Sequence, residues 1–238
     1  MGIRRLATAA AVAVLLAACG SDDATTDDAT ETTADTSTDD DTTAETADAG
    51  DASQADCPPD EGTDGQTQTF DAPPPMCLDD DATYEAVVTT NKGEFTIALD
   101  PEQAPVTTNN FVFLARHRYF DDTVCHRIIP DFVVQCGDPT ATGTGGPGYT
   151  IVDEPPAPGR YRVGSIAMAK TPAPDSGGSQ FFIITGANGT ALPPEYSLFG
   201  EVTAGLDDTV AAMAAAGTPG AGVPSETIAI ESTRIVQS

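Results

Sequence analysis

The residues best suited to do chemistry in this chain lie in one short stretch, residues 126–138, where an arginine and a glutamine flank a turn. A proline–aspartate pair ending at Asp131 separates two apolar runs, which predicts a β-hairpin. A three-residue turn centred on Asp131 places Arg127 opposite Gln135 if the two side chains share a face. The Arg127 guanidinium, close to the apolar Phe132, needs a partner that the Gln135 amide can supply. The pattern therefore predicts a permanently charged donor beside an apolar pocket.

Other kinds of catalytic site find little support in the sequence. The glycine-rich segment 143–148 lacks the Lys-Ser/Thr ending and the following helix of a phosphate-binding loop. The two histidines, His117 and His126, are not accompanied by a Gly-x-Ser-x-Gly elbow, which argues against a Ser-His-Asp hydrolase. No Cys-x-x-Cys or histidine spacing typical of a metal site accompanies the cysteines, so we expect no metal.

The hairpin resembles the signature hairpin of the cyclophilins, a family of peptidyl-prolyl cis-trans isomerases, and further segments match that family in the right order. These segments are Gly137–Gly148 (GDPTATGTGGPG), Gly164–Ala169 (GSIAMA), Gly178–Ile183 (GSQFFI) and Leu192–Gly200 (LPPEYSLFG). A single match would be weak, but matches in register cover roughly residues 83–238. The resemblance implies an isomerase that needs no cofactor.

Rotation about an X-Pro bond needs a particular kind of help. The barrier of about 18–20 kcal/mol comes from amide resonance, so lowering it requires neither a nucleophile nor proton transfer. A pocket that grips the proline ring helps, together with a donor directed at the prolyl nitrogen as that nitrogen becomes pyramidal and basic. Arginine suits this task because its charge is fixed and its donors form a rigid fork.

The resemblance also implies roles for individual residues. Arg127 and Gln135 would be the catalytic residues: Arg127 would donate to the prolyl nitrogen, and Gln135 would orient Arg127 and contact the substrate backbone. His126 would not transfer a proton in the reaction. The implied substrate-binding residues are Phe132, Val133, Phe182 and Leu192 in the proline pocket, Tyr196 closing it where many relatives have histidine, and Ala169, Lys170 and Gln180 along the extended peptide. Each phenylalanine could otherwise be plain core, and an isolated arginine is more often a surface ion-pair residue.

Two departures from the family pattern bear on these expectations. Cys125 stands where relatives often have phenylalanine, and Cys136 where they often have glycine. The chain has no tryptophan, and Ala191-Leu192 occupies the region in which many eukaryotic members use one against cyclosporin. We therefore expect weak cyclosporin binding, with no necessary effect on proline turnover.

Hydrophobic periodicity predicts a mainly β domain. Two helices are expected, at 105–118 and 206–216, from apolar residues at helical spacing. Strands are expected at 84–90, 94–99, 124–129, 132–136, 164–169, 180–185, 197–203 and 226–236. Many strands with only two helices favour a closed antiparallel eight-stranded barrel capped by the helices, which is also the cyclophilin-like architecture.

The N-terminal residues resemble a bacterial lipoprotein signal. Residues 1–18 combine two arginines with an apolar run too short to be a convincing membrane span, and the stretch ending at Cys19 resembles a lipobox. We expect Cys19 to be lipidated and the protein to be extracytoplasmic, held to the cell membrane through the lipid anchor only. Ordinary cleavage after a small residue, which would leave Cys19 as a free thiol, is the alternative.

Residues 19–56 are almost wholly Asp, Thr, Ala, Glu and Ser, which predicts an acidic disordered tether. Of the 37 acidic residues, 20 lie between Asp22 and Asp81, so the folded part is only moderately acidic. No basic face suggests nucleic-acid binding, and the charged tail favours a monomer. A Cys- and Pro-rich lead-in, residues 57–82, precedes the isomerase domain at 83–238.

Four cysteines besides Cys19 suit an oxidising compartment. Cys57 and Cys77 flank an aperiodic segment that a disulfide would staple. Cys125 and Cys136 lie on the two arms of the hairpin, close enough to bridge. However, strict alternation puts these two on opposite faces if Arg127 and Gln135 share one, so only a bulge or strong twist would allow the bond.

Three readings of function remain. The first is an isomerase that acts on X-Pro bonds of exported proteins as they fold. The second is a module that binds proline-containing segments without catalysis, for which the arginine in particular would be unnecessary. The third is a stalked surface lipoprotein whose domain has no proline-binding role. The presence of Arg127 together with Phe132, Gln135 and Phe182 favours the first.

Overall fold

The computed structural model describes residues 56–238, and these form one mainly β domain. The predicted signal peptide (1–18), the lipidation site Cys19 and nearly all of the predicted tether (19–56) lie outside the described residues. Among the described residues, no helix is long and apolar enough to span a membrane. That part of the chain also contains no cluster of three or more His, Cys, Asp or Glu residues able to hold a metal.

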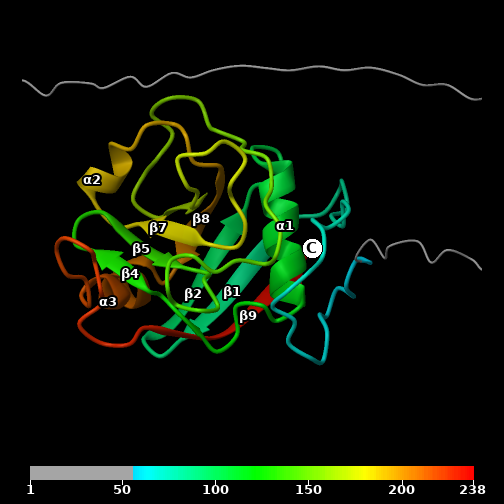
Figure 1. Cartoon of the computed structure of the whole chain (residues 1–238), viewed down its shortest axis with the longest axis horizontal. Coiled ribbons are helices and arrows are strands. Elements are labelled where there is room, and N and C mark those ends of the chain that lie inside the picture. Colours follow the sequence, from blue (N-terminus) through cyan, green and yellow to red (C-terminus); the bar gives the residue numbers. More distant parts are fainter. Residues whose placement is uncertain (1–55) are drawn as a thin grey trace, which may run out of the picture. The chain divides into compact units, whose positions relative to one another are not determined.

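All nine strands belong to one curled antiparallel sheet (Figure 1). Their order across the sheet is β3-β9-β1-β2-β8-β6-β7-β5-β4. The strands are β1 (Tyr84–Thr90), β2 (Gly93–Leu99), β3 (Thr123–Val124), β4 (Arg127–Ile129), β5 (Val133–Cys136), β6 (Ser165–Met168), β7 (Phe181–Ile184), β8 (Leu198–Ala204) and β9 (Ala229–Gln237).

The predicted eight-stranded closed barrel with two helices differs from this structure in detail. The expected strand 124–129 is interrupted at Cys125 and His126, so it forms two strands, β3 and β4, at opposite ends of the strand order. An isolated bridge joins Val124 of β3 to Asp138, which follows β5. Strands β3 and β4 at the two ends of the order are not paired with each other, so the sheet is a nine-stranded half-barrel that this single bridge only partly closes, rather than a regular eight-stranded barrel.

The helices also differ from the prediction. Helix α1 (Pro105–Arg116) lies within the predicted range, but the second predicted helix begins as a π-helical turn, η1 (Leu206–Val210), and continues as α3 (Ala211–Ala214). A further single turn, α2 (Ala187–Thr190), is too short to show helical periodicity in the sequence. Asp131 of the hairpin turn stabilises its start by accepting from the Ala187 N–H at 2.8 Å.

Strands β6 and β7 are buried on both faces along their whole length, which explains the continuous apolar sequence of β7. In β7, Phe181 and Ile183 face the main core. Their neighbours Phe182 and Ile184 face a second apolar cluster on the outer side of the sheet. This outer cluster consists of Val133, Tyr161, Ala167, Phe182, Ile184 and Leu198, with Phe132, Ala169, Leu192 and Tyr196 packed against it.

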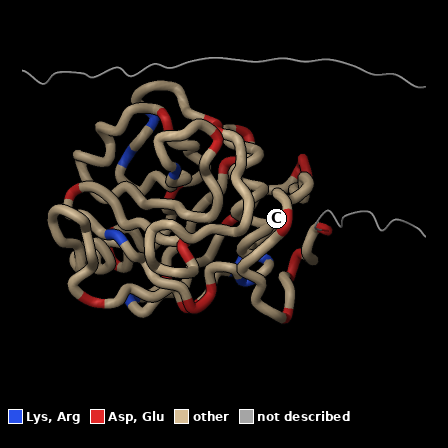
Figure 2. The backbone as a smooth tube through the Cα atoms, in the orientation of Figure 1, with Lys and Arg blue, Asp and Glu red and all other residues tan. Residues whose placement is uncertain are grey.

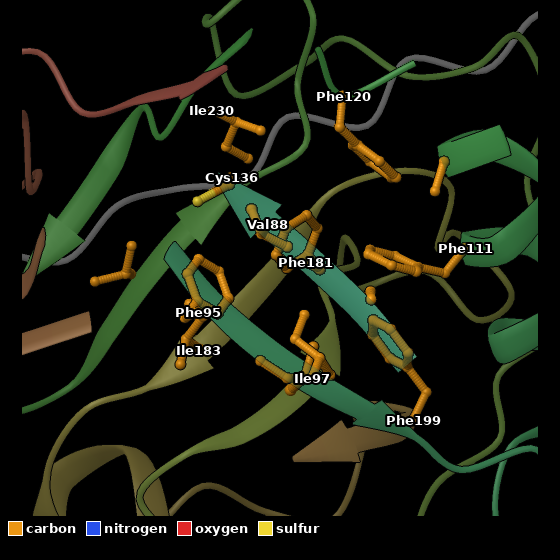
Figure 3. Packing of buried hydrophobic residues seen from close by; sticks show 14 of the residues in the cluster. Val88, Phe95, Ile97, Phe111, Phe120, Cys136, Phe181, Ile183, Phe199 and Ile230 are labelled. Carbon is orange, nitrogen blue, oxygen red and sulfur yellow. The ribbon is translucent and has the colours of Figure 1, made fainter. Parts of the chain in front are cut away.

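The main core is organised around aromatic side chains (Figure 3). Phe111 projects from α1 and meets Phe120 at 4.9 Å, Phe199 at 5.2 Å and Phe181 at 5.4 Å between ring centroids. These contacts connect α1 to β7 and β8, so the helix is fixed against the inner face of the sheet. Edge-on and offset aromatic pairs of this kind add about 0.5–1.5 kcal/mol each beyond their buried area.

Helix α1 is unusual because every residue from Thr107 to Arg116 is buried. The sheet covers one side of it, and the lead-in (residues 57–82) runs along the other, as the cyan trace beside α1 in Figure 1 shows. The lead-in is bonded along the helix: the Thr63 N–H donates to Arg116 O at 2.8 Å, and the Asn109 amide donates to Pro75 O at 2.8 Å. The lead-in is therefore a structural part of the domain.

A disulfide between Cys57 and Cys77 closes the lead-in, with a Cα–Cα separation of 5.5 Å. The same segment supplies Asp60, which pairs with the buried guanidinium of Arg116 at 2.8 Å. A buried charge left without a partner would be costly, so this ion pair ties the lead-in to the end of α1.

The second disulfide joins Cys125 to Cys136, both of which face the main core. Regular alternation from Arg127 would have turned Cys125 outward. The interruption at Cys125 and His126 resolves this conflict because it lets the chain rotate between β3 and β4. On the other arm, Gly137 adopts a φ of +86° and has no room for a Cβ, which would lie 2.3 Å from Ser179 O.

Basic residues are few and scattered among acidic ones along the described backbone (Figure 2). Four of them lie in ion pairs: Lys92 with Glu226, Arg116 with Asp60, Arg118 with Asp121, and Lys170 with Asp153. This distribution gives no continuous basic face of the kind that nucleic acids require.

Candidate functional site

The site is built on the outer face of the β4–β5 hairpin and of β7. Arg127 is directly opposite Gln135 in the β4–β5 register, and Gln135 is opposite Phe182 in the β5–β7 register. In the turn that sets this register, Asp131 adopts a left-handed backbone conformation with a φ of +55°. Asp131 tolerates this left-handed conformation better than most residues and uses its carboxylate to cap α2.

Three side chains and one carbonyl form a chain of hydrogen bonds, which we call the amide relay. Arg127 Nη1 donates to Gln135 Oε1 at 3.2 Å, and Gln135 Nε2 donates to Gln180 Oε1 at 3.0 Å. Gln180 Nε2 in turn donates to the carbonyl oxygen of Gly145 at 2.9 Å. Within the described residues, Arg127 makes no other side-chain hydrogen bond or ion pair, so most of its five donors remain available to a ligand.

An apolar pocket of about 160 Å³ lies beside Arg127. It is lined by Arg127, Phe132, Val133, Gln135, Ala169, Lys170, Phe182, Leu192 and Tyr196. The Arg127 guanidinium lies 5.6 Å from the centre of the Phe132 ring, so the charge contacts one wall of the pocket. Phe182 and Tyr196 meet edge to face, with ring centroids 5.4 Å apart, and form another wall.

A larger hollow of about 760 Å³ adjoins this pocket and shares Gln135, Ala169 and Lys170 with it. Gln180 and the second half of the glycine-rich loop (residues 137–148), from Gly143 to Gly148, line its other sides. Lys170 is held in place by an ion pair with Asp153, while the Ala169 N–H donates to Gln180 O at 2.8 Å. All ten residues predicted for the site thus line one or both of two adjoining hollows.

Two residues that support the site were absent from the sequence-based expectations. Asp138 is fully buried, and its carboxylate accepts from the N–H groups of Thr140, Thr142, Gly143 and Gly145 at 2.6–3.1 Å. Burial raises the pKa of this carboxyl, but the hydrogen bonds outweigh that effect and hold its pKa below the usual value. The Asp-Pro-Thr sequence carries a turn signal that could have suggested this role.

The other supporting residue is Tyr161, whose hydroxyl donates to Tyr196 O at 2.7 Å and accepts from the Tyr196 N–H at 3.0 Å. Burial raises the pKa of Tyr161 to about 12, so the hydroxyl remains protonated at neutral pH. It fixes the backbone of Tyr196 behind the pocket wall. No local sequence pattern indicates this contact, because 35 residues separate the two tyrosines.

His126, next to the arginine, has no hydrogen-bond partner at either ring nitrogen among the described residues. Burial lowers its pKa, Asp138 raises it and Arg127 lowers it again, with a net shift below the ordinary value. The ring is therefore neutral at neutral pH and is not positioned for proton transfer by a partner. This arrangement agrees with a reaction that transfers no proton.

The fold and the site together define a mainly β domain in which Arg127 lies beside a small pocket, and the comparisons with known proteins identify its family. Residues 86–235 match the family model described as cyclophilin type peptidyl-prolyl cis-trans isomerase/CLD. The chain belongs to this family. The match begins after the lead-in, so residues 57–82 are additional to the part that the family model covers.

Several relatives are named as peptidyl-prolyl cis-trans isomerases. The chain is 37% identical over 174 residues to a probable peptidyl-prolyl cis-trans isomerase B of Mycobacterium leprae, covering 66% of this chain and 58% of that protein. It is 46% identical over 118 residues to peptidyl-prolyl cis-trans isomerase B of Bacillus subtilis, covering 49% and 80%. The chain spans only 58% of the length of the Mycobacterium leprae protein and 50% of the length of a probable isomerase B of Mycobacterium tuberculosis.

A solved structure shows the same fold. The crystal structure of a cyclophilin type peptidyl-prolyl cis-trans isomerase from Cryptosporidium parvum, in the presence of the dipeptide Ala-Pro, matches with a TM-score of 0.59 and 31% identity. The match covers 64% of this chain and 98% of that one.

Proposed function

We propose that this protein is a peptidyl-prolyl cis-trans isomerase that accelerates rotation about X-Pro bonds. The observation that carries the proposal is the position of Arg127, which is in register with Gln135, beside a small apolar pocket and with donors to spare. A pure binding module would need the pocket but has no evident use for an unpaired guanidinium at its rim. Family membership supports the same activity.

The proposed mechanism uses binding and electrostatics alone. The pocket of about 160 Å³ is smaller than typical sites for drug-sized ligands, and its size suits a single proline ring. With the ring held by Phe132, Phe182 and Leu192, the peptide bond can twist while the rest of the substrate lies in the adjoining hollow. Twisting removes amide resonance and leaves the lone pair on the prolyl nitrogen, to which Arg127 donates. Gln135 aims the guanidinium and has no role as a base.

The substrates that we propose are proline-containing segments of exported proteins. The two disulfides suit an oxidising compartment, which supports a location outside the cytoplasm. The lipobox-like sequence before Cys19 supports attachment to the cell membrane through a lipid, with residues 19–56 as a tether. We further propose a monomer that binds cyclosporin weakly, since Ala191-Leu192 replaces the tryptophan region.

Exchange spectroscopy on a short Ala-Pro-Phe peptide tests the activity. In the presence of a small molar fraction of the purified protein, we expect cis and trans resonances to exchange far faster than the uncatalysed tens to hundreds of seconds. Line broadening and shifts that indicate binding without faster exchange would instead identify a non-catalytic module. A peptide with alanine in place of proline serves as the control for non-specific binding.

A further inference from the structure

The lead-in contacts the glycine-rich loop around Phe70. The Phe70 N–H donates to Pro147 O at 2.8 Å. Gly148, with a φ of +100°, passes so close to Phe70 that a Cβ on it would lie 2.4 Å from Phe70 O. The Phe70 ring also lies edge-on to Tyr149, with centroids 6.3 Å apart. The lead-in therefore supports the loop from outside the region matched by the family model.

Phe70 is itself held firmly. Its ring packs on Phe113 and His117 of helix α1 and its end, with centroid distances of 5.0 and 5.1 Å. The Cys57–Cys77 disulfide closes the segment that contains it, and hydrogen bonds from Thr63 and Asn109 tie that segment to α1 on both sides of Phe70. A contact made by Phe70 is thus a contact with the rigid part of the domain.

The loop that Phe70 supports determines the direction of the amide relay. The Gly145 carbonyl can only accept a hydrogen bond, so Gln180 must turn its NH₂ group toward it and its oxygen toward Gln135. Gln135 must then present its NH₂ group to Gln180 and its oxygen to Arg127, which can only donate. If Gly145 moved away, the Gln180 amide could turn over and face Gln135 with its NH₂ group. Gln135 would then have to turn over as well, and its NH₂ group would face the Arg127 guanidinium, donor against donor.

We propose that Phe70 is a positioning residue for catalysis: through Pro147 and Gly148 it holds the Gly145 carbonyl where it orients Gln180, Gln135 and finally Arg127. This proposal rests on the proposed isomerase function, because it concerns the efficiency of the same site. It assigns to the lead-in a role in the peptide-binding groove in addition to covering α1.

The test compares Phe70→Ala with Gln66→Ala in the full, oxidised chain. Gln66 lies in the same lead-in and donates to Arg118 O and Asp121 O, away from the loop. Phe70→Ala keeps the backbone groups that contact Pro147 and Gly148, but it removes the ring that anchors them on Phe113 and His117 and that meets Tyr149. The loop is then no longer fixed to the helix, and we expect kcat/KM to fall about tenfold, the effect of misaligning one hydrogen bond worth about 1.4 kcal/mol. The side-chain amide resonances of Gln180 and Gln135 should shift as well. Gln66→Ala should change neither kcat/KM nor those resonances.

Gly148→Ala supplies a second variant because it pushes the loop away from Phe70 without altering the lead-in. It should reproduce both effects, and it decides the matter if Phe70→Ala does not fold. If both kcat/KM and the amide resonances of a folded variant stay at their wild-type values, Phe70 only covers α1 and the proposal is wrong. If the wild-type protein is inactive, the proposed function fails, while the amide resonances still report whether Phe70 orients the relay.

Discussion

Replacing the buried Asp138 by asparagine should loosen the glycine-rich loop and weaken the site. One carboxylate oxygen accepts from Thr142, Gly143 and Gly145, and the other accepts from both the N–H and the hydroxyl of Thr140. In Asp138→Asn an NH₂ group must replace one of these oxygens and face at least one N–H donor. Hydrogen bonds to a charged group contribute about 1.5–3 kcal/mol each, so the loss of one to two should cost about 3 kcal/mol.

The same carboxylate makes stability depend on pH. Because hydrogen bonds hold the folded pKa of Asp138 below its ordinary value of 3.8, the unfolded chain takes up a proton first as the pH falls. The stabilisation is therefore fully present above about pH 4 and is lost as the pH falls through the folded pKa. In Asp138→Asn this contribution is missing at every pH, so the difference from wild type should shrink in strong acid.

Denaturant unfolding at pH 7 and at pH 3, with kcat/KM measured at pH 7, tests this reasoning. Glu231→Gln, an exposed position on β9, serves as the charge-matched control. We expect Asp138→Asn to unfold about 3 kcal/mol more easily at pH 7 and to lose activity through Gly145 and Gln180. A free energy of unfolding and a kcat/KM equal to those of Glu231→Gln would refute the idea that Asp138 organises the loop.

Three further outcomes are expected. Replacing Cys57 and Cys77 by serine should lower the free energy of unfolding by about 3 kcal/mol, measured in guanidinium chloride, because the bond closes a loop with a sequence separation of 20; equal midpoints would contradict this. Tyr161→Phe leaves the backbone N–H and C=O of Tyr196 without their partner, so KM should rise several-fold and the free energy of unfolding should fall by about 1–2 kcal/mol. An unchanged KM would contradict the assignment of Tyr196 as a wall of the substrate pocket. Burial lowers the pKa of His126, so stability should decline as the pH falls below 6.5, whereas kcat/KM should stay flat from pH 7 to 9; a bell-shaped profile in that range would indicate proton transfer.

The β4–β5 hairpin shows which features of the site can be predicted from the sequence by local rules. Turn chemistry at Asp131 and period-two alternation were sufficient to place Arg127 opposite Gln135, because both are local rules. The break at Cys125 was outside those rules. It depends on a rotation of the chain between two strands that pair with different parts of the sheet, and no spacing within the hairpin encodes that rotation.

The lead-in shows the opposite limit. Its Pro-, Gly- and Thr-rich composition predicted an irregular segment, which is what the structure contains. Its packing against α1 and against the glycine-rich loop depends on backbone hydrogen bonds from Thr63, Thr67 and Phe70 to residues 53, 50 and 77 positions further along the chain. Such contacts follow from the folded arrangement and have no periodic signature. The burial of all residues from Thr107 to Arg116 is the clearest sign that a second layer covers the helix.

The most direct measurement is a protease-coupled isomerisation assay that compares the wild-type protein with Arg127→Ala on a short Ala-Pro-Phe peptide. Removing a preorganised donor from a developing charge typically lowers the rate about 10²–10³-fold, and the same loss in kcat/KM is expected here. Peptide binding, measured in parallel by titration, should persist because Phe132, Phe182 and Leu192 still form the pocket. Acceleration by Arg127→Ala equal to that of the wild-type protein would contradict the assignment of this arginine as the catalytic donor.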